Sequence, residues 1–133
     1  MLLINLILNG ILMGIILMTQ FVSYPLLKSI PENSFTNYHA TYTRYIAPLV
    51  GPLMVFELTI ISLLTFQDAT DTLLIASTAL VILIWLSTIF IQVPLHNKLA
   101  AGHDSKKINR LIQSNWIRTL CWTIKFTLAL MLL

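Results

Sequence analysis

The stretch Leu73–Val93, LLIASTALVILIWLSTIFIQV, contains no charged residue and few polar ones. An α-helix rises about 1.5 Å per residue, so roughly 20 residues cross the hydrocarbon core of a bilayer, which is about 30 Å thick. This stretch therefore predicts a transmembrane helix. Three more stretches of similar length and hydrophobicity lie before and after it in the chain. They are Leu2–Tyr24, Ile46–Phe66 and Asn115–Leu133.

The composition of the whole chain also favours a membrane location. Of its 133 residues, 57% are hydrophobic and only 10% are charged, which leaves too little polar surface to cover a soluble globular domain. The formal net charge of +3 is modest and does not indicate nucleic-acid binding. The sequence thus predicts an all-α, polytopic membrane protein, in which residues 1–133 form a single four-transmembrane-helix bundle.

The positions of the basic residues predict the orientation of this bundle. The connection between the second and third spans is short and acidic, whereas the two other loops, residues 25–45 and 94–114, are longer and basic. Neither the short connection nor the termini hold any Lys or Arg. Because cytoplasmic loops carry an excess of Lys and Arg, both long loops are expected in the cytoplasm and both termini on the non-cytoplasmic side. A bacterial-type inner membrane is the expected location.

The loop after the first span is predicted to contain a helix. Ser29 and Glu32 have the spacing of a capping box, with Ser29 as the cap. Aromatic residues then recur at spacings of three and four, which predicts one aromatic helix face. They are Phe35, Tyr38, Tyr42 and Tyr45. Such a helix is expected to lie at the cytoplasmic membrane surface, with its tyrosines at the interface, and to lead into the second span.

Three ionisable residues lie inside the predicted spans. Each costs roughly 2.5–3.5 kcal/mol on insertion scales, so such residues normally face the bundle interior and find partners. Glu57 and Lys125 both lie about 15 Å from the cytoplasmic ends of their spans, at about 1.5 Å per residue. They are predicted to approach each other as an ion pair or through water. Arg118 precedes Lys125 by seven residues, which nearly completes two helical turns, and is expected to line the cytoplasmic half.

Further polar residues are predicted to face the same interior. The first span places Asn5, Asn9 and Gln20 on roughly one face. In the third helix, Gln92 and His96 have the i, i+4 spacing of neighbours on one side. One interpretation is a polar site that opens towards the cytoplasm. The alternative is that these groups only hydrogen-bond one helix to another.

No metal or cofactor site is predicted. His96 and His103 are seven residues apart, a spacing that matches no common metal motif. Two facing histidines can hold a haem, but none of the histidines sits well inside a predicted span. The lone Cys121 has no cysteine or histidine at ligand spacing and is interpreted as a helix-packing residue.

Short motifs in the second half of the chain resemble those of a known family. They are Pro94-Leu95-His96-Asn97-Lys98-Leu99 and Asn115-Trp116-Ile117-Arg118-Thr119, together with Tyr24-Pro25 in the first half. In these motifs and in its length, the chain is similar to the anthrone-oxygenase-like proteins, small four-helix membrane proteins of mostly unknown function. Asn115 stands where the family motif has a histidine. The resemblance implies a cytoplasmic half that holds a lipophilic aromatic substrate, oxidised without a metal or organic cofactor and lined by His96, Asn97, Asn115, Trp116 and Arg118.

Three kinds of function are compatible with these observations. The first is an enzyme or binding protein for a lipophilic small molecule, with a general base such as His96. The second is a non-catalytic accessory or assembly subunit of a larger membrane complex, and the third is a proton or ion pathway. The expected partners are the lipid bilayer, a lipophilic small molecule and further membrane subunits or copies of this chain. The candidate ligand-lining residues are Gln20, Glu57, Gln92, His96, Asn97, Asn115, Trp116, Arg118 and Lys125.

Overall fold

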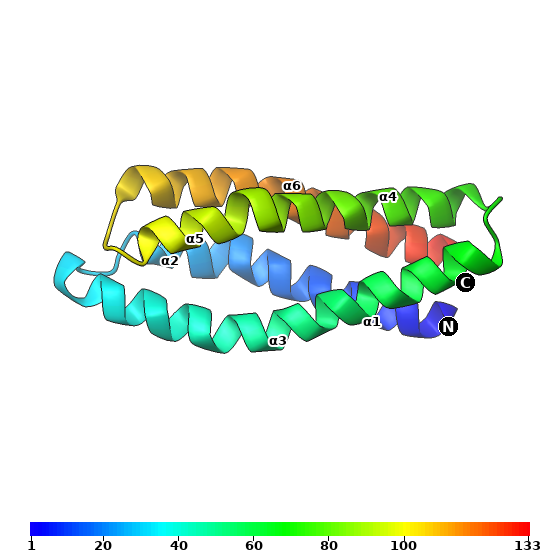
Figure 1. The fold of residues 1–133 in the computed structure, drawn as a ribbon, viewed down its shortest axis with the longest axis horizontal. Coiled ribbons are helices and arrows are strands. Elements are labelled where there is room, and N and C mark those ends of the chain that lie inside the picture. The colour runs from blue at the N-terminus through cyan, green and yellow to red at the C-terminus, as the bar shows by residue number, and fades with distance from the viewer.

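The chain folds into four long antiparallel helices in a computed structural model that describes all 133 residues (Figure 1). The helix formed by α1, η1 and α2 is continuous, as is the one formed by α4, η2 and α5, and η1 and η2 are π-helical turns within them. No strand is present. The elements are α1 (Leu2–Met18), η1 (Thr19–Ser23), α2 (Tyr24–Leu27), α3 (Glu32–Gln67), α4 (Thr72–Ser87), η2 (Thr88–Gln92), α5 (Val93–Leu99) and α6 (Ser105–Met131).

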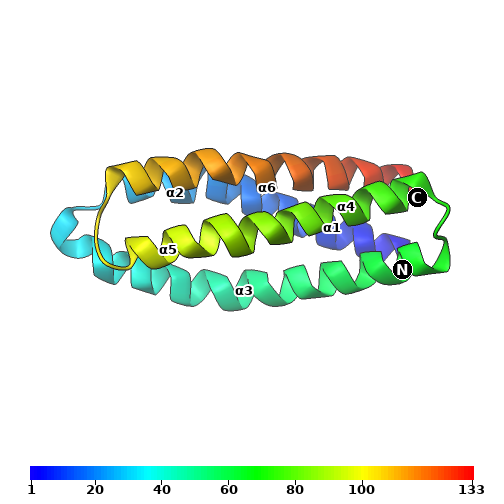
Figure 2. The ribbon, with the colours of Figure 1, turned by 45° about the horizontal axis from the view of Figure 1, so that its top comes forward.

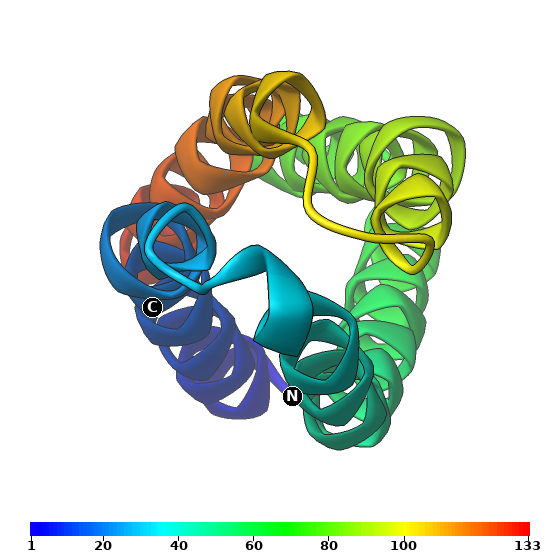
Figure 3. The same cartoon turned by 90° about the vertical axis from the view of Figure 1, so that its left-hand side faces the viewer.

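The four helices lie at the corners of a square when the bundle is viewed end-on (Figure 3). α6 packs against α1 on one side and α4 on the other, and α3 lies diagonally opposite α6 (Figure 2). Both termini and the loop 68–71 lie at one end, here called the terminal end (Figure 1). The loops 28–31 and 100–104 lie at the other end, here called the basic end (Figure 1). α3 and α6 therefore run in the same direction, from the basic end to the terminal end.

Three of the helices are long and apolar enough to cross a membrane. They are Leu2–Leu27, Glu32–Gln67 and Thr72–Leu99. The fourth, α6, falls outside this group, and its sequence includes Arg118 and Lys125. The outer surface of the bundle carries many large apolar side chains, such as Phe66, which is 88% exposed. An all-helical bundle with such a surface is suited to contact with lipid.

The helices extend past the predicted spans at the basic end. Residues 32–45, predicted to lie in a loop, form the first part of α3, and α6 begins at Ser105. The 36 residues of α3 measure about 54 Å at 1.5 Å per residue, which exceeds the roughly 30 Å of a hydrocarbon core. A bilayer around the apolar part of the bundle would therefore leave one or both ends of α3 outside the hydrocarbon.

The helix predicted in the first loop is present, but it is the beginning of α3 and packs into the bundle. It begins at Glu32 without a side-chain cap, so the capping role predicted for Ser29 is wrong. The predicted aromatic face is divided as well, because Phe35 is fully buried whereas Tyr45 is 73% exposed. His39, one turn after Phe35, is the second fully buried side chain of this segment. The interior contacts of the bundle thus determine which side of the helix turns inward.

Two aspartates cap the other helices that follow a loop. Asp71 and Asp104 each accept hydrogen bonds from two backbone N–H groups in the first turns of α4 and α6. The bonds from the backbone and side chain of Lys107 lower the pKa of Asp104 below its usual value. The stabilisation from this cap is therefore complete above the unfolded-state pKa and is lost as the pH falls through the lower folded-state pKa.

Buried apolar side chains gather in three clusters along the bundle. The basic-end cluster consists of Tyr24, Leu27, Phe35, Leu95, Leu99, Ile108 and Leu111. The middle cluster consists of Leu12, Ile16, Met54, Ile84, Cys121 and Trp122, so Cys121 has the packing role predicted for it. The terminal cluster consists of Leu8, Ile60, Ile61, Leu64, Leu74 and Val81.

Candidate functional site

A cavity of about 280 Å³ lies between the middle cluster and the basic-end cluster. All four long helices contribute to its wall, mostly with apolar side chains. Its larger polar side chains are Tyr24, Tyr42, Gln92, His96 and Arg118. Most of these lie on the parts of the helices nearest the basic end, so the cavity has an apolar end and a polar end.

The cavity lies beside a segment of α3 that packs loosely. Between His39 and Met54, no residue of α3 is fully buried. Pro48 and Pro52 lie on the exposed side of this segment. Each lacks the N–H that would bond four residues back, and its ring crowds that turn, so the helix bends. Figure 1 shows α3 as a continuous helix that bows outward. The bowed segment lines the cavity with Ile46, Ala47, Val50 and Gly51.

The size and lining of the cavity suit a compact aromatic molecule. A cavity of about 150 Å³ is enough to hold benzene, so about 280 Å³ has room for two fused rings. Trp85, Trp122 and Tyr42 supply aromatic walls. Gly51 also lines the cavity, and a Cβ atom added there would meet nothing within 4 Å.

Three hydrogen-bonded side chains lead from the cavity towards the basic end. The Tyr24 hydroxyl lies 3.0 Å from His96 Nε2, and His96 Nδ1 lies 3.0 Å from His39 Nε2. The chain thereby joins α2, α5 and α3. Because each imidazole nitrogen donates or accepts according to the tautomer, the direction of these bonds can reverse. Such a chain is able to pass a proton between its two ends.

His96 also borders an open groove between α3 and α5, here called the side groove. His39 and Asn97 line this groove as well. Four residues line both the cavity and the side groove, namely Ile46, Ala47, Val93 and His96. The hydrogen-bonded chain therefore begins at the cavity with Tyr24 and ends at the side groove with His39.

Arg118 supplies a positive charge to the cavity wall. Its side chain is 8% exposed, and its Nε has no hydrogen-bond partner. The guanidinium carbon lies 5.3 Å from the ring centroid of Trp122, at cation–π distance. No carboxylate pairs with it, since the only ion pairs in the protein are Lys107 with Asp104 and Lys125 with Glu57.

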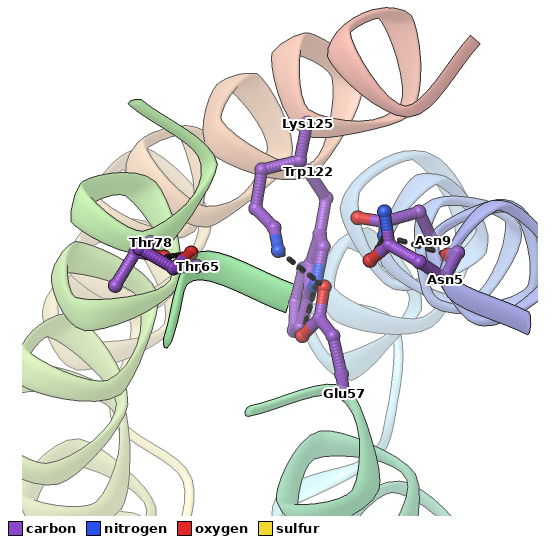
Figure 4. Close-up of polar contacts among 7 residues, drawn as sticks. All are labelled: Asn5, Asn9, Glu57, Thr65, Thr78, Trp122 and Lys125. Carbon is purple, nitrogen blue, oxygen red and sulfur yellow. Dashed lines mark hydrogen bonds and ion pairs between the residues drawn. The ribbon is translucent and has the colours of Figure 1, made fainter. Parts of the chain in front are cut away.

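Glu57 and Lys125 form a buried ion pair, which confirms the pairing predicted from their depth (Figure 4). Lys125 Nζ lies 3.0 Å from Glu57 Oε1, and the two side chains are 1% and 0% exposed. Trp122 Nε1 donates to both carboxylate oxygens, at 3.1 and 3.2 Å. Trp122 thus contacts both Glu57 and Arg118, while neither member of the ion pair lines the cavity.

The two π-helical turns each end two residues before a proline. η1 precedes Pro25, and η2 precedes Pro94. A π turn contains one residue more than a regular turn, and this wider turn accommodates the missing proline N–H and the bulk of its ring. Each turn also contributes a buried glutamine, Gln20 from η1 and Gln92 from η2.

These glutamines hydrogen-bond the helices to one another. Gln20 Oε1 accepts from Asn115 Nδ2 at 2.9 Å and from Thr119 Oγ1 at 3.2 Å. Gln92 Nε2 donates to Ser114 Oγ at 3.0 Å. Both glutamines therefore hydrogen-bond to α6. At Gln20 the contacts are those of the alternative interpretation, in which a polar residue links one helix to another.

Two further polar contacts lie at the terminal end. Figure 4 shows the Thr65 hydroxyl of α3 in contact with the Thr78 hydroxyl of α4, and Asn9 bonded to Asn5 within α1.

The chain matches no protein family model, no curated protein and no solved structure. The assignment of a function therefore depends on the cavity and the side chains around it.

The residues predicted to line a ligand site fall into three groups. Gln92, His96 and Arg118 line the cavity, and Asn97 lines the side groove. The others lie outside the cavity wall: Gln20 and Asn115 bond to each other, Glu57 and Lys125 pair, and Trp116 is 41% exposed beside Phe21.

Five aromatic residues of the site were not among the candidates predicted from the sequence: Tyr24, His39, Tyr42, Trp85 and Trp122. For Trp122 a signal was available, because it lies four residues after Arg118 and three before Lys125, on the same helix face. His39 likewise lies four residues after Phe35, on a face that was assigned to the aromatic residues alone. Tyr24 follows η1, and a π turn cannot be read from hydrophobic periodicity.

Proposed function

We propose that this protein is a four-span integral membrane protein that binds a lipophilic aromatic small molecule in the cavity. The observation that carries this proposal is the cavity itself, with aromatic walls and polar groups gathered at one end. Small-molecule sites are usually apolar hollows with a few convergent polar groups that fix the orientation of the ligand. Here Trp85 and Trp122 would hold the rings, and His96 and Arg118 would contact the polar substituent.

In this proposal α6 crosses the membrane with the three more apolar helices. Its two intramembrane cations, Arg118 and Lys125, point inward and are 8% and 1% exposed, so lipid would meet its apolar side chains, such as Leu120. The positive-inside rule then assigns the basic end to the cytoplasm and both termini to the opposite side. The polar end of the cavity and the side groove would face the cytoplasm.

The family resemblance adds a reaction to this binding function, namely oxidation of the bound aromatic molecule, for which dioxygen would be the oxidant. Tyr24 and His96 are the side chains placed to exchange a proton with a ligand, because their hydrogen bond lies at the cavity wall. Binding is the part of the proposal that the cavity supports directly.

Native mass spectrometry of the protein extracted gently from its own membrane tests the binding function. The wild type is expected to retain a small molecule, and Gly51→Leu is expected to retain roughly tenfold less, equivalent to about 1.4 kcal/mol of binding free energy. The reason is that the new side chain extends into the cavity while its Cβ meets nothing within 4 Å.

Gly14→Leu is the matched control for this variant. Gly14 is also helical, and a Cβ there also meets nothing within 4 Å, but Gly14 is exposed and does not line the cavity. Both changes replace a helical glycine with a better helix former, so their effects on the helices are similar. Equal retention in both variants would place the molecule outside the cavity. A stoichiometric protein partner without any small molecule would favour the accessory-subunit function instead.

A further inference from the structure

Arg118 is the one buried charge in the bundle that lacks a counter-charge. Of the three charged side chains in the interior, Glu57 and Lys125 pair with each other. Among the groups that line the cavity with Arg118, the hydroxyls of Tyr24 and Tyr42 lie within its electrostatic reach. A tyrosine hydroxyl is neutral at physiological pH, so neither supplies a negative charge.

The protein itself offers no anion that could approach Arg118. The carboxylate of Glu57 accepts hydrogen bonds from Trp122 and lies 3.0 Å from Lys125 Nζ. The face of the Trp122 ring attracts the guanidinium but carries no net charge. A buried cation is costly unless it is paired and hydrogen-bonded, and an anion in the cavity would supply the counter-charge that Arg118 lacks.

We infer that the ligand of the cavity carries a single negatively charged oxygen group, a carboxylate or the ionised hydroxyl of a phenol or enol, and that this group binds Arg118. This inference rests on the proposed function and specifies the chemical class of its ligand. A guanidinium presents several N–H donors in one plane, which suits the oxygens of such a group. The apolar end of the cavity, with Trp85 and Met54, then receives the rings.

Tyr24 is placed to donate a second hydrogen bond at the same end of the cavity. When His96 carries its proton on Nε2, it donates to the Tyr24 oxygen across their 3.0 Å contact. The tyrosine O–H is then free to point into the cavity, towards the oxygen that Arg118 binds. The ligand oxygen would thus meet a cation and a neutral donor.

Calorimetric titration of the purified protein with 2-naphthoate and 2-naphthamide tests this inference, because the two probes share a ring system and differ in charge. The wild type is expected to bind 2-naphthoate at least roughly tenfold more tightly than the neutral amide. Arg118→Met is expected to abolish this preference while it still binds the amide. Arg118→Lys keeps the positive charge but loses the planar set of N–H donors of the guanidinium. This variant is expected to keep part of the preference for 2-naphthoate.

The outcomes separate this inference from the proposed function. If both probes bind equally to the wild type and Gly51→Leu weakens both, the cavity binds aromatic molecules but the inference about charge is overturned. If neither probe binds, both the proposed binding of an aromatic molecule and the inference about its charge are contradicted. Decanoate carries the same carboxylate on a fatty-acid chain, and weaker binding of decanoate than of 2-naphthoate supports an aromatic ligand. Equal or tighter binding would overturn the aromatic assignment.

The stability of the ligand-free protein gives a readout that does not depend on the probes. Arg118→Met is expected to leave the melting temperature unchanged or raised, because it removes an unpaired buried cation. A clear fall in the melting temperature would show that Arg118 stabilises the fold, and it would overturn the assignment of Arg118 to ligand binding.

Discussion

Lys125→Met is expected to lower the free energy of unfolding by about 3–5 kcal/mol, because it leaves the carboxylate of Glu57 buried without a counter-charge. Glu57 is 0% exposed, and its remaining hydrogen bonds come from Trp122 alone. Methionine is similar in length to lysine and fills most of the space, so the loss reports the charge more than the packing. Chemical or thermal unfolding in detergent micelles, followed by circular dichroism, measures the change.

The double variant Lys125→Met with Glu57→Gln is expected to recover part of this loss. Glutamine still accepts a hydrogen bond from Trp122 Nε1 but carries no charge that needs a partner. The coupling between the two changes is expected to be about 0.5–3 kcal/mol, as for residues in direct contact. Independent, additive effects of the two single changes would contradict a stabilising pair.

Lys107→Met is the control for these measurements. Lys107 also lies 3.0 Å from a carboxylate, that of Asp104, but both side chains are substantially exposed. Water and salt screen such a pair, so its loss is expected to change stability little. A similar loss in Lys107→Met and Lys125→Met would mean that burial is not the cause of the effect.

Phe35→Ala is expected to destabilise the protein by about 3–5 kcal/mol, as removal of a large buried aromatic side chain usually does. Phe35 is fully buried in the basic-end cluster. Its ring stacks on His39 at a centroid distance of 5.7 Å and lies nearly perpendicular to the His103 ring at a centroid distance of 5.0 Å. Phe35 therefore packs the beginning of α3 against the rest of the bundle. Unfolding measurements in detergent report its contribution to the free energy of unfolding.

Tyr45→Ala separates this packing from a membrane-surface role of the same segment. Tyr45 is 73% exposed and belongs to no buried cluster, so its removal is expected to change the stability in detergent little. If residues 32–45 lay on the membrane surface, the two substitutions would have similar small effects in detergent. A large effect of Phe35→Ala alone is the result that the fold requires.

The helices and the depths of residues along them were predictable from the sequence. In lipid, the backbone N–H and C=O groups of a spanning segment must be hydrogen-bonded within that segment. An apolar stretch such as Leu73–Val93 is therefore expected to form a helix. The rise per residue is constant, and the depth of Glu57 and of Lys125 therefore follows from counting residues. Their ion pair was predicted for this reason, because burial of two opposite charges at one depth favours their contact.

The rotation of each helix was not predictable in the same way. A π turn adds a residue, which turns everything after it by about 100° relative to a regular helix. Tyr24 and His96 follow such turns, and they meet across the bundle in a contact that helical periodicity does not reveal. The beginning of α3 also turns His39 inward, towards His96, because the packing of Phe35 sets its rotation.

The amino-acid sequence by itself thus determined four helices, their order and the level of each polar side chain along the bundle axis. Only the tertiary structure decided which polar side chains share a cavity. That choice depends on the bow of α3 around Pro48 and Pro52, on the two π turns and on Trp122, which contacts both Glu57 and Arg118. The physical reason is that depth is a property of one helix, whereas a cavity depends on how the facing surfaces of several helices fit together.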